Sequence, residues 1–246
     1  MQLGVKLINT FPFSLIIGEG GLIYVRNLVR QGQKVIDEKN ITHLYSSFRP
    51  FADHYAAYLL KRRNPHLIWI ADFRDLIIDP HYHHLFLEKH HQQFFKKIFS
   101  KAKVLTTVSE GLAKHLREYN SNVVVVRNGI RDNIKEPKGH PSEYFTIVYT
   151  GSMFLDKRNP RPLFQAISEM SAAGEVVKGD VRIINAGKDP ESWLAMAKEF
   201  GLEKMMEIKG LVSPEDAERL QQIACMNLLL TISSDELQGV LTGKMI

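Results

Sequence analysis

Two aspartates and an arginine stand at the end of an apolar run, and side chains of these types can take part in catalysis or ligand binding. Residues 68–84 read IWIADFRDLIIDPHYHH, so Asp72, Arg74 and Asp75 come first and three histidines follow. Carboxylates can orient hydroxyl groups or move protons, and an arginine can pair with a carboxylate or a phosphate. The stretch could be a metal site, an acid–base centre, or a strand that ends in a polar loop.

The metal interpretation rests on His84, Glu88 and His91. Their i, i+4, i+7 spacing places them on one face of a helix, and such a spacing can chelate zinc. No obvious further ligand lies nearby in the sequence. We therefore favour a solvated histidine-rich loop followed by a helix, and we expect no metal and no cofactor.

The elements around this stretch alternate between strands and helices. The apolar and β-branched runs predict strands at 42–47, 66–72, 103–109 and 122–129. Helices are predicted at 22–38, 51–63, 85–101 and 110–119, the last with Ser109 as its N-cap. Continuous Val and Ile runs are typical of parallel strands that are buried on both faces.

The alternation stops at a segment with two prolines and several charges and then resumes. We interpret 137–144 as a linker between a first domain, 1–136, and a second, 145–246. Strands are predicted at 145–151, 181–187, 205–210 and 226–233, and helices at 160–172, 190–200 and 214–224. The fold class is therefore α/β with two Rossmann-like, doubly wound domains, in which ligands bind beyond the carboxyl ends of the strands.

Polar and small residues recur at these strand ends. In the first domain the residues expected to line a cleft between the domains are Ser46, Ser109, Asn128 and Gly129. In the second domain the corresponding residues are Gly151, Ser152, Lys157, Arg158, Gly239 and Lys244. Small residues permit close backbone approach, and two adjacent cations can neutralise a diphosphate.

Charge is distributed unevenly along the chain. Residues 1–140 hold 21 Lys and Arg against 12 Asp and Glu, whereas residues 141–246 hold 11 against 15. A basic half can face an anionic partner such as acidic lipid or a phosphate-bearing substrate. Nucleic acid is disfavoured because no recognition motif accompanies the charge. The single cysteine, Cys225, excludes a disulfide framework, and we expect a cytoplasmic protein.

Six stretches in register resemble a GT-B glycosyltransferase of the retaining family 4 type. They cover most of 42–246 and read YSSFRPFADHYAAYLLK, WIADFRDLI, VLTTVSEGLAKHL, VVVRNGIRD, YTGSMFLDKRNPRPLFQAI and GLVSPEDAERLQQIACMNLLLTIS with LQGVLTGKMI. The resemblance implies sugar transfer from a nucleotide sugar, such as a UDP- or GDP-sugar, to a glycan or lipid-linked acceptor. It also implies that no divalent metal is needed.

The resemblance assigns roles to particular residues. Gly151 and Ser152 would form the turn beneath the donor phosphates, and Lys157 and Arg158 would neutralise the diphosphate leaving group, with Gly239 and Lys244 also on the donor side. Asp72, Arg74 and Asp75 would lie on the acceptor side as the candidate catalytic residues. Many relatives carry a histidine at that strand end, so no single base is assigned. Alternatively, Arg74 forms only a structural ion pair with Asp75.

The sequence departs from the family pattern at its front and at its back. The first strands and the donor-binding glutamate helix have no counterpart, so we expect both domains to be incomplete and the chain to be truncated at both ends. Two other functions stay open, an inactive remnant that binds anions or a membrane surface, and a nucleotide-sugar epimerase. The basic amphipathic segment 87–103 fits a helix packed on its sheet better than a peripheral helix at the inner face of a membrane.

Overall fold

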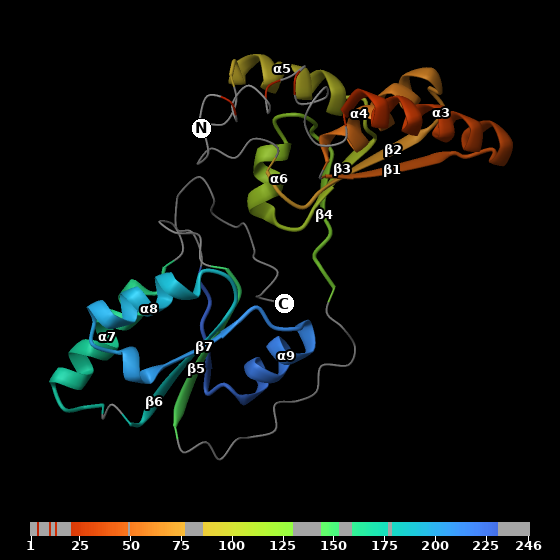
Figure 1. Ribbon diagram of the computed structural model, residues 1–246. Coiled ribbons are helices and arrows are strands. Elements are labelled where there is room, and N and C mark those ends of the chain that lie inside the picture. Colours follow the sequence, from red (N-terminus) through yellow and green to blue (C-terminus); the bar gives the residue numbers. More distant parts are fainter. Residues whose placement is uncertain are drawn as a thin grey trace. The chain divides into compact units, whose positions relative to one another are not determined.

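The computed structural model describes residues 4, 10, 13, 21–48, 50–76, 86–129, 144–152, 159–176 and 179–230. The chain divides into two compact units, and among the described residues the first holds those up to Gly129 and the second those from Tyr144 onward (Figure 1). Each unit contains its own four-stranded parallel sheet. The α/β, Rossmann-like fold class predicted from the sequence is confirmed. All but Tyr144 of the predicted linker 137–144 lies outside the described residues.

The first unit is a parallel sheet in which the strands follow their order in the chain. Its elements are α3 (Gly21–Lys39), β1 (His43–Phe48), α4 (Phe51–Arg63), β2 (Ile68–Phe73), α5 (Glu88–Phe99), β3 (Val104–Thr107), α6 (Glu110–Leu116) and β4 (Val123–Val125). The sheet order is β1-β2-β3-β4. Because each right-handed crossover moves one strand further in the same direction, α4, α5 and α6 belong on one face.

The helix-covered face of this sheet carries the aromatic core of the first unit. Trp69 and Phe73 of β2 pack against Phe95 and Phe99 of α5, and all four are buried. The same cluster includes Leu116 of α6. The interpretation of 87–103 as a helix packed on its sheet is therefore confirmed, because the apolar side of α5 is used within the fold.

The opposite face of the same sheet is open within the described part of the chain. Tyr45 is 59% exposed, and Ile68 and Val124 are exposed as well. Their neighbours along each strand point to the covered face because successive side chains alternate. Ser47, Asp72 and Thr106, near the carboxyl ends of β1, β2 and β3, lie on this face.

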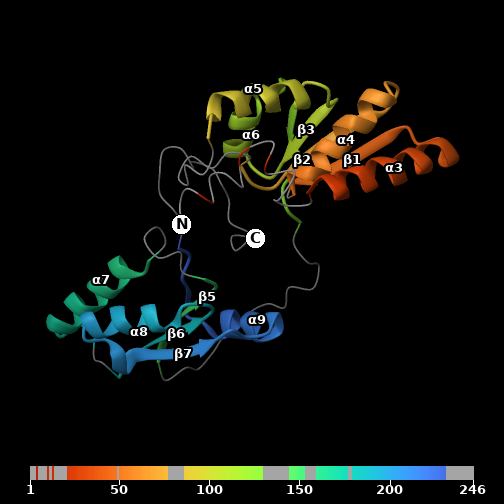
Figure 2. The same cartoon turned by 45° about the horizontal axis from the view of Figure 1, so that its top comes forward.

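Helix α3 packs along α4 rather than on the strands, and the two helices lie side by side in both views (Figures 1 and 2). Val25, Val29 and Ile36 form the buried side of α3. At Gly32 the helices approach so closely that a Cβ atom would lie 2.8 Å from a methyl group of Leu60. This close contact also brings polar residues of α3 near polar residues of α4.

The second unit is doubly wound. Its elements are β5 (Phe145–Thr150), α7 (Arg161–Ala172), β6 (Val181–Ala186), α8 (Pro190–Glu199), a 3₁₀ turn (Glu203–Met205), β7 (Met206–Gly210), α9 (Pro214–Ile223) and β8 (Met226–Asn227). The sheet order is β7-β6-β5-β8. The chain therefore moves outward from β5 to β7 and then returns to pair β8 with the other side of β5.

Helices cover both faces of the second sheet. Phe164 of α7 and Trp193 of α8 pack with Tyr149 of β5 in one core cluster. Helix α9 lies on the other face, where Gln221 donates a hydrogen bond to the Thr150 hydroxyl at 2.6 Å (Figure 1). In such sheets, ligands bind beyond the carboxyl ends of the strands at the point where the strand order reverses, which is between β5 and β8 here.

Most predicted elements form close to their expected bounds, and two strands are less than half as long as predicted. The 122–129 strand spans only Val123–Val125, although Val126 still donates to the Thr107 carbonyl at 2.7 Å. The 226–233 strand spans Met226–Asn227, and its last three residues lie outside the described part of the chain. Ser109 is the N-cap of α6, as predicted, and accepts from the Leu112 amide at 3.3 Å.

Candidate functional site

Asp72 is the centre of a polar cluster at the carboxyl ends of β1, β2 and β3. Its side chain is nearly buried, and the residue as a whole is 2% exposed. Thr106 Oγ1 donates to Oδ1 at 2.7 Å, while Arg74 Nε at 2.7 Å and Ser47 Oγ at 3.3 Å donate to Oδ2. Ser47, Asp72 and Thr106 meet because they are register partners in adjacent strands.

Arg74 extends from this cluster to the end of the sheet. Its Nη1 donates to the side-chain oxygen of Asn128, which follows β4, and its side chain stays partly exposed. The alternative in which Arg74 pairs with Asp75 is wrong, since the ion pair is with Asp72. Asp75 is exposed and forms no hydrogen bond or ion pair with the described residues. The arginine is thus held in place, while one carboxylate stays open to solvent.

The electrostatics keep Asp72 ionised. Burial on its own would raise the pKa of this carboxyl, but hydrogen bonds from Thr106, Arg74 and Tyr45 and the charge of Arg74 hold the pKa below its usual value. The same hydrogen bond to Asp72 raises the pKa of the Arg74 guanidinium. Since its oxygens are already occupied, Asp72 is suited to positioning Arg74 rather than to moving a proton.

Ser46 lies on the opposite face of β1 from this cluster. It is buried, its hydroxyl accepts from Trp69 Nε1 at 2.9 Å, and it forms a 2.7 Å hydrogen bond with His54 Nδ1. His54 is fully buried, and its ring lies 4.6 Å from that of Phe73. Desolvation lowers the pKa of His54 to about 3, although the Asp72 backbone carbonyl acts in the other direction. The structure therefore places Ser46 in a buried aromatic core with a neutral histidine.

The other predicted site residues of the first unit have different roles. Ser109 is buried and its hydroxyl caps α6, while Asn128 joins the cluster through Arg74. A Cβ atom at Gly129 would meet nothing within 4 Å. Asp72, Arg74 and Asn128 are thus brought together, and Ser46 and Ser109 are not.

The sequence reasoning did not select Ser47, Thr106 or Tyr45 for this cluster. Tyr45 and Ser47 are two residues apart on β1, and Thr106 is the register partner of Asp72 on β3. All three lie on the face of the sheet that carries Asp72. The period of two along a strand was the available signal, because it separates Ser47 from Ser46 once the face of Asp72 is known.

Two glycines define the corresponding strand ends of the second unit. Gly151 follows β5 with a φ of 141°, and its amide donates to the Ala186 carbonyl at 2.8 Å. A Cβ atom at Gly187, after β6, would lie only 1.8 Å from the Gly151 carbonyl oxygen. The Tyr149 hydroxyl donates to the Ser152 carbonyl at 2.9 Å and so fixes the next residue. The result is a close backbone approach at the carboxyl ends of β5 and β6, and β5 is also one of the two strands between which the strand order reverses.

The remaining predicted donor-side residues, Lys157, Arg158, Gly239 and Lys244, lie outside the described residues, as does His84. His91 is buried, with its ring 5.7 Å from that of Phe95, and burial together with nearby His90 lowers its pKa. Within the described ranges, no group of three His, Cys, Asp or Glu side chains is placed to hold a metal ion. None of the described helices is both long enough and apolar enough to cross a membrane.

Comparison with known proteins identifies the fold. No family model matches the sequence. No curated protein matches it either. A glycosyltransferase from Rickettsia africae ESF-5 superposes with a TM-score of 0.61 at 17% identity, over 84% of this chain and 56% of the other.

Two further solved structures agree with this likeness. The lipopolysaccharide outer core galactosyltransferase WaaB gives a TM-score of 0.58 at 13% identity, over 88% of this chain and 57% of WaaB. TarM gives 0.55 at 13% identity, over 83% and 39%. The chain thus spans less than two thirds of the length of each. The fold is the Rossmann-like architecture of GT-B glycosyltransferases.

Proposed function

We propose that this chain transfers a sugar from a nucleotide-sugar donor, and that its second unit binds the donor diphosphate. The observation that carries the proposal is the glycine turn, the close approach of Gly151 and Gly187 after the neighbouring strands β5 and β6, with β5 also forming one side of the strand-order reversal between β5 and β8. Ligands of doubly wound sheets bind at such a reversal, and glycines let a phosphate approach the backbone. The likeness in fold to glycosyltransferases supports this choice of ligand.

The donor side needs positive charge where the leaving group departs. We assign this role to Lys157 and Arg158, which follow the turn in sequence. Two cations next to a diphosphate stabilise the charge that grows as the glycosidic bond breaks, which raises the rate of transfer. In this proposal they take the place that a divalent metal has in other transferases, and Gly239 and Lys244 complete the donor side.

The acceptor side is the polar cluster of the first unit. Asp75 is exposed and free of partners among the described residues, so its carboxylate can accept a hydrogen bond from an acceptor hydroxyl. Arg74, which precedes Asp75 in the sequence and is held in place by Asp72 and Asn128, has further N–H groups that can donate to an acceptor. We therefore assign contact with the acceptor to Asp75 and Arg74, and positioning of Arg74 to Asp72.

The finer assignments are part of the same proposal. The donor is a UDP- or GDP-sugar, the transfer is of the retaining, family 4 type, and the acceptor is a glycan or a lipid-linked saccharide. The protein acts in the cytoplasm, in contact with the anionic inner face of a membrane through its basic first unit. These assignments rest on the six sequence stretches that resemble such enzymes and on the excess of Lys and Arg in residues 1–140.

Calorimetric titration with UDP and with GDP tests the donor site. The intact chain should bind at least one of them with a dissociation constant of about 1 mM or tighter. Lys157→Ala and Arg158→Ala should each weaken binding by about tenfold, since each removes a charge-assisted contact to phosphate. Lys204 is an exposed lysine of the same unit, in the 3₁₀ turn that precedes β7. Lys204→Ala should therefore leave the affinity unchanged. Equal binding by all three variants would contradict the assigned roles.

A further inference from the structure

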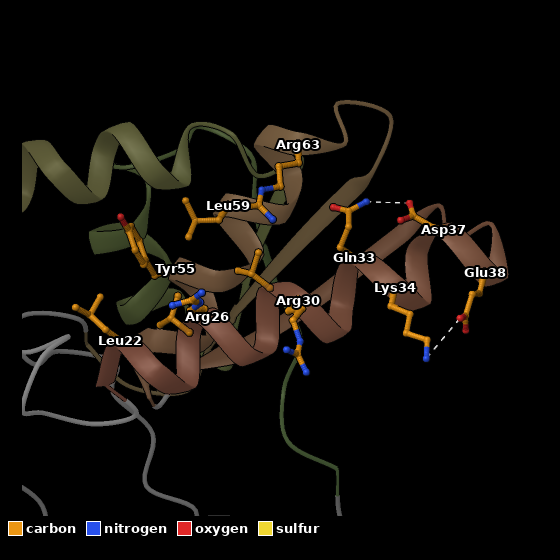
Figure 3. Close-up of a pocket in the computed structure, with 12 residues that line it drawn as sticks. Leu22, Arg26, Arg30, Gln33, Lys34, Asp37, Glu38, Tyr55, Leu59 and Arg63 are labelled. Carbon is orange, nitrogen blue, oxygen red and sulfur yellow. Dashed lines mark hydrogen bonds and ion pairs between the residues drawn. The ribbon is translucent and has the colours of Figure 1, made fainter.

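Helices α3 and α4 leave a groove along their outer side that no part of the proposed transfer reaction uses. The groove has a volume of about 1010 Å³ and is lined by side chains of both helices (Figure 3). The helices start next to each other, where the Tyr24 hydroxyl donates to Asp53 at 2.8 Å. Further along, Gln33 and Asn64 exchange hydrogen bonds of 2.8 and 3.1 Å. The groove therefore runs parallel to both helix axes.

The floor of the groove is apolar. Val25 and Val29 of α3 lie at its base and are only 3% and 5% exposed because they pack against α4, so the half-buried Tyr55 and Leu59 of α4 supply most of the accessible apolar surface there. Leu22 is exposed at one end of the groove. This arrangement follows from spacing, because residues three and four apart share one side of a helix. The apolar part of the groove is about 10 Å long, at 1.5 Å of rise per residue from Leu22 to Val29.

The rim of the groove carries arginines without a counter-charge. Arg26 and Arg30 of α3 and Arg63 of α4 are exposed, and none forms a hydrogen bond or an ion pair with the described residues (Figure 3). The far end is different, because Lys34 pairs with Glu38 at 3.7 Å and Gln33 donates to Asp37 at 2.9 Å. Positive charge is thus concentrated along the part of the rim that borders the apolar floor.

We propose that this groove binds one amphipathic α-helix of a protein partner, with apolar side chains on the floor and carboxylates against Arg26, Arg30 and Arg63. An α-helix is about 10–12 Å across, and its apolar stripe has the straight, narrow shape of the floor. Guanidinium groups pair with carboxylates in a bidentate geometry, which supplies the charge complementarity. A flat membrane surface fits less well, because the apolar lining of the groove is recessed, with Tyr55 and Leu59 only half-exposed.

Two synthetic peptides of about four helical turns test the proposal on the full chain. Both carry leucine at i, i+3, i+4 and i+7, and the flanking positions are glutamate in one peptide and lysine in the other. In fluorescence anisotropy the glutamate peptide should bind with a dissociation constant of roughly 10–100 µM, and the lysine peptide at least about tenfold more weakly. This partner site is independent of the donor site, so added UDP should leave the peptide affinity unchanged.

Charge reversal on the rim provides the control. Arg30→Glu should weaken binding of the glutamate peptide about fivefold and strengthen binding of the lysine peptide. Arg62→Glu is the matched variant, since Arg62 is exposed on α4 but lies over the Tyr58 ring, outside the groove. It should change neither affinity, and circular dichroism should show that both variants are folded.

Two results would overturn the proposal. The first is a glutamate peptide that does not bind, or binds equally to the Arg30→Glu and Arg62→Glu variants. The second is that vesicles containing phosphatidylserine bind the chain and lose that binding in Arg30→Glu, while neither peptide binds. That outcome would assign the arginines to a lipid surface instead.

Discussion

At the scale of single residues, the two aspartates after β2 have different roles. Asp72 is buried, ionised and hydrogen-bonded by side chains from β1 and β3 and by Arg74. Asp75 is exposed and has no hydrogen-bond or ion-pair partner among the described residues. A buried acceptor that loses its charge leaves its donors unsatisfied, whereas an exposed carboxylate is already hydrated. Asp72 therefore stabilises the site, and Asp75 is available to a ligand.

Replacing each aspartate by asparagine should separate these roles. Asp72→Asn should lower the free energy of unfolding of the first unit by about 1–3 kcal/mol, because Arg74 loses its counter-charge. Asp75→Asn should change it by less than about 0.5 kcal/mol. Urea denaturation followed by Trp69 fluorescence in a Trp193→Phe background measures this unit, since the chain has two tryptophans. Equal losses in both variants would contradict the assignment.

His54 should make the first unit sensitive to acid. Its folded pKa of about 3 lies below the ordinary value of 6.5, so only the unfolded chain binds this proton between those values. Stability from the neutral imidazole is therefore complete above about pH 6.5 and falls by about 1.4 kcal/mol per pH unit below it, until about pH 3. The Asp72 contribution has the same sign, is complete above the ordinary carboxyl pKa of 3.8, and is lost as the pH falls through its lowered folded pKa.

Urea midpoints measured from pH 7 to 4.5 test this dependence. His54→Gln should reduce the slope of unfolding free energy against pH by the amount that one bound proton contributes. His43→Gln, at an exposed position on β1, should leave that slope unchanged. The buried position of His54 could not be predicted from its sequence neighbours, because α4 has apolar residues on several sides. A slope that is unchanged in His54→Gln would show that the histidine is not the group that titrates.

At the scale of elements, strand ends were predictable but strand faces were not. The apolar runs placed Asp72, Gly151 and Gly187 at the carboxyl ends of parallel strands, where the structure has them, whereas Asn128 lies beyond the end of β4 at Val125. The choice between Ser46 and Ser47 depends on which face of β1 packs under the helices, and that face is set by tertiary packing. The α3–α4 groove likewise depends on the close approach at Gly32, which no local pattern reveals.

The glycine turn of the second unit gives a prediction at this scale. Gly187→Ala would place a methyl group 1.8 Å from the Gly151 carbonyl oxygen, so β5 and β6 must separate at their ends. We expect a loss of about 1–3 kcal/mol in unfolding free energy and at least about tenfold weaker nucleotide binding. Gly179→Ala is the matched control, because nothing lies within 4 Å of its added Cβ. Chemical denaturation and calorimetry measure the two effects, and equal behaviour of both variants would refute the close approach.

At the scale of the whole molecule, each unit carries one half of the proposed chemistry. The first unit holds the Asp72–Arg74 cluster, and its basic excess includes the three groove arginines. The second unit is acidic overall, and its glycine turn lies after β5 and β6, beside the strand-order reversal where we propose that the diphosphate binds. The sequence pattern was sufficient for the fold class. The donor cations Lys157 and Arg158 stay predictions, since they lie outside the described residues.

The central claim is that a nucleotide diphosphate binds at the glycine turn of the second unit. Titration of the ¹⁵N-labelled chain with UDP and GDP to about 5 mM, followed by amide chemical shifts, tests it most directly. We predict that the amides of Gly151, Ser152 and Gly187 shift with saturation for at least one nucleotide, and that α3 and α4 do not respond. No shift with either nucleotide, or shifts confined to the first unit, would contradict the account.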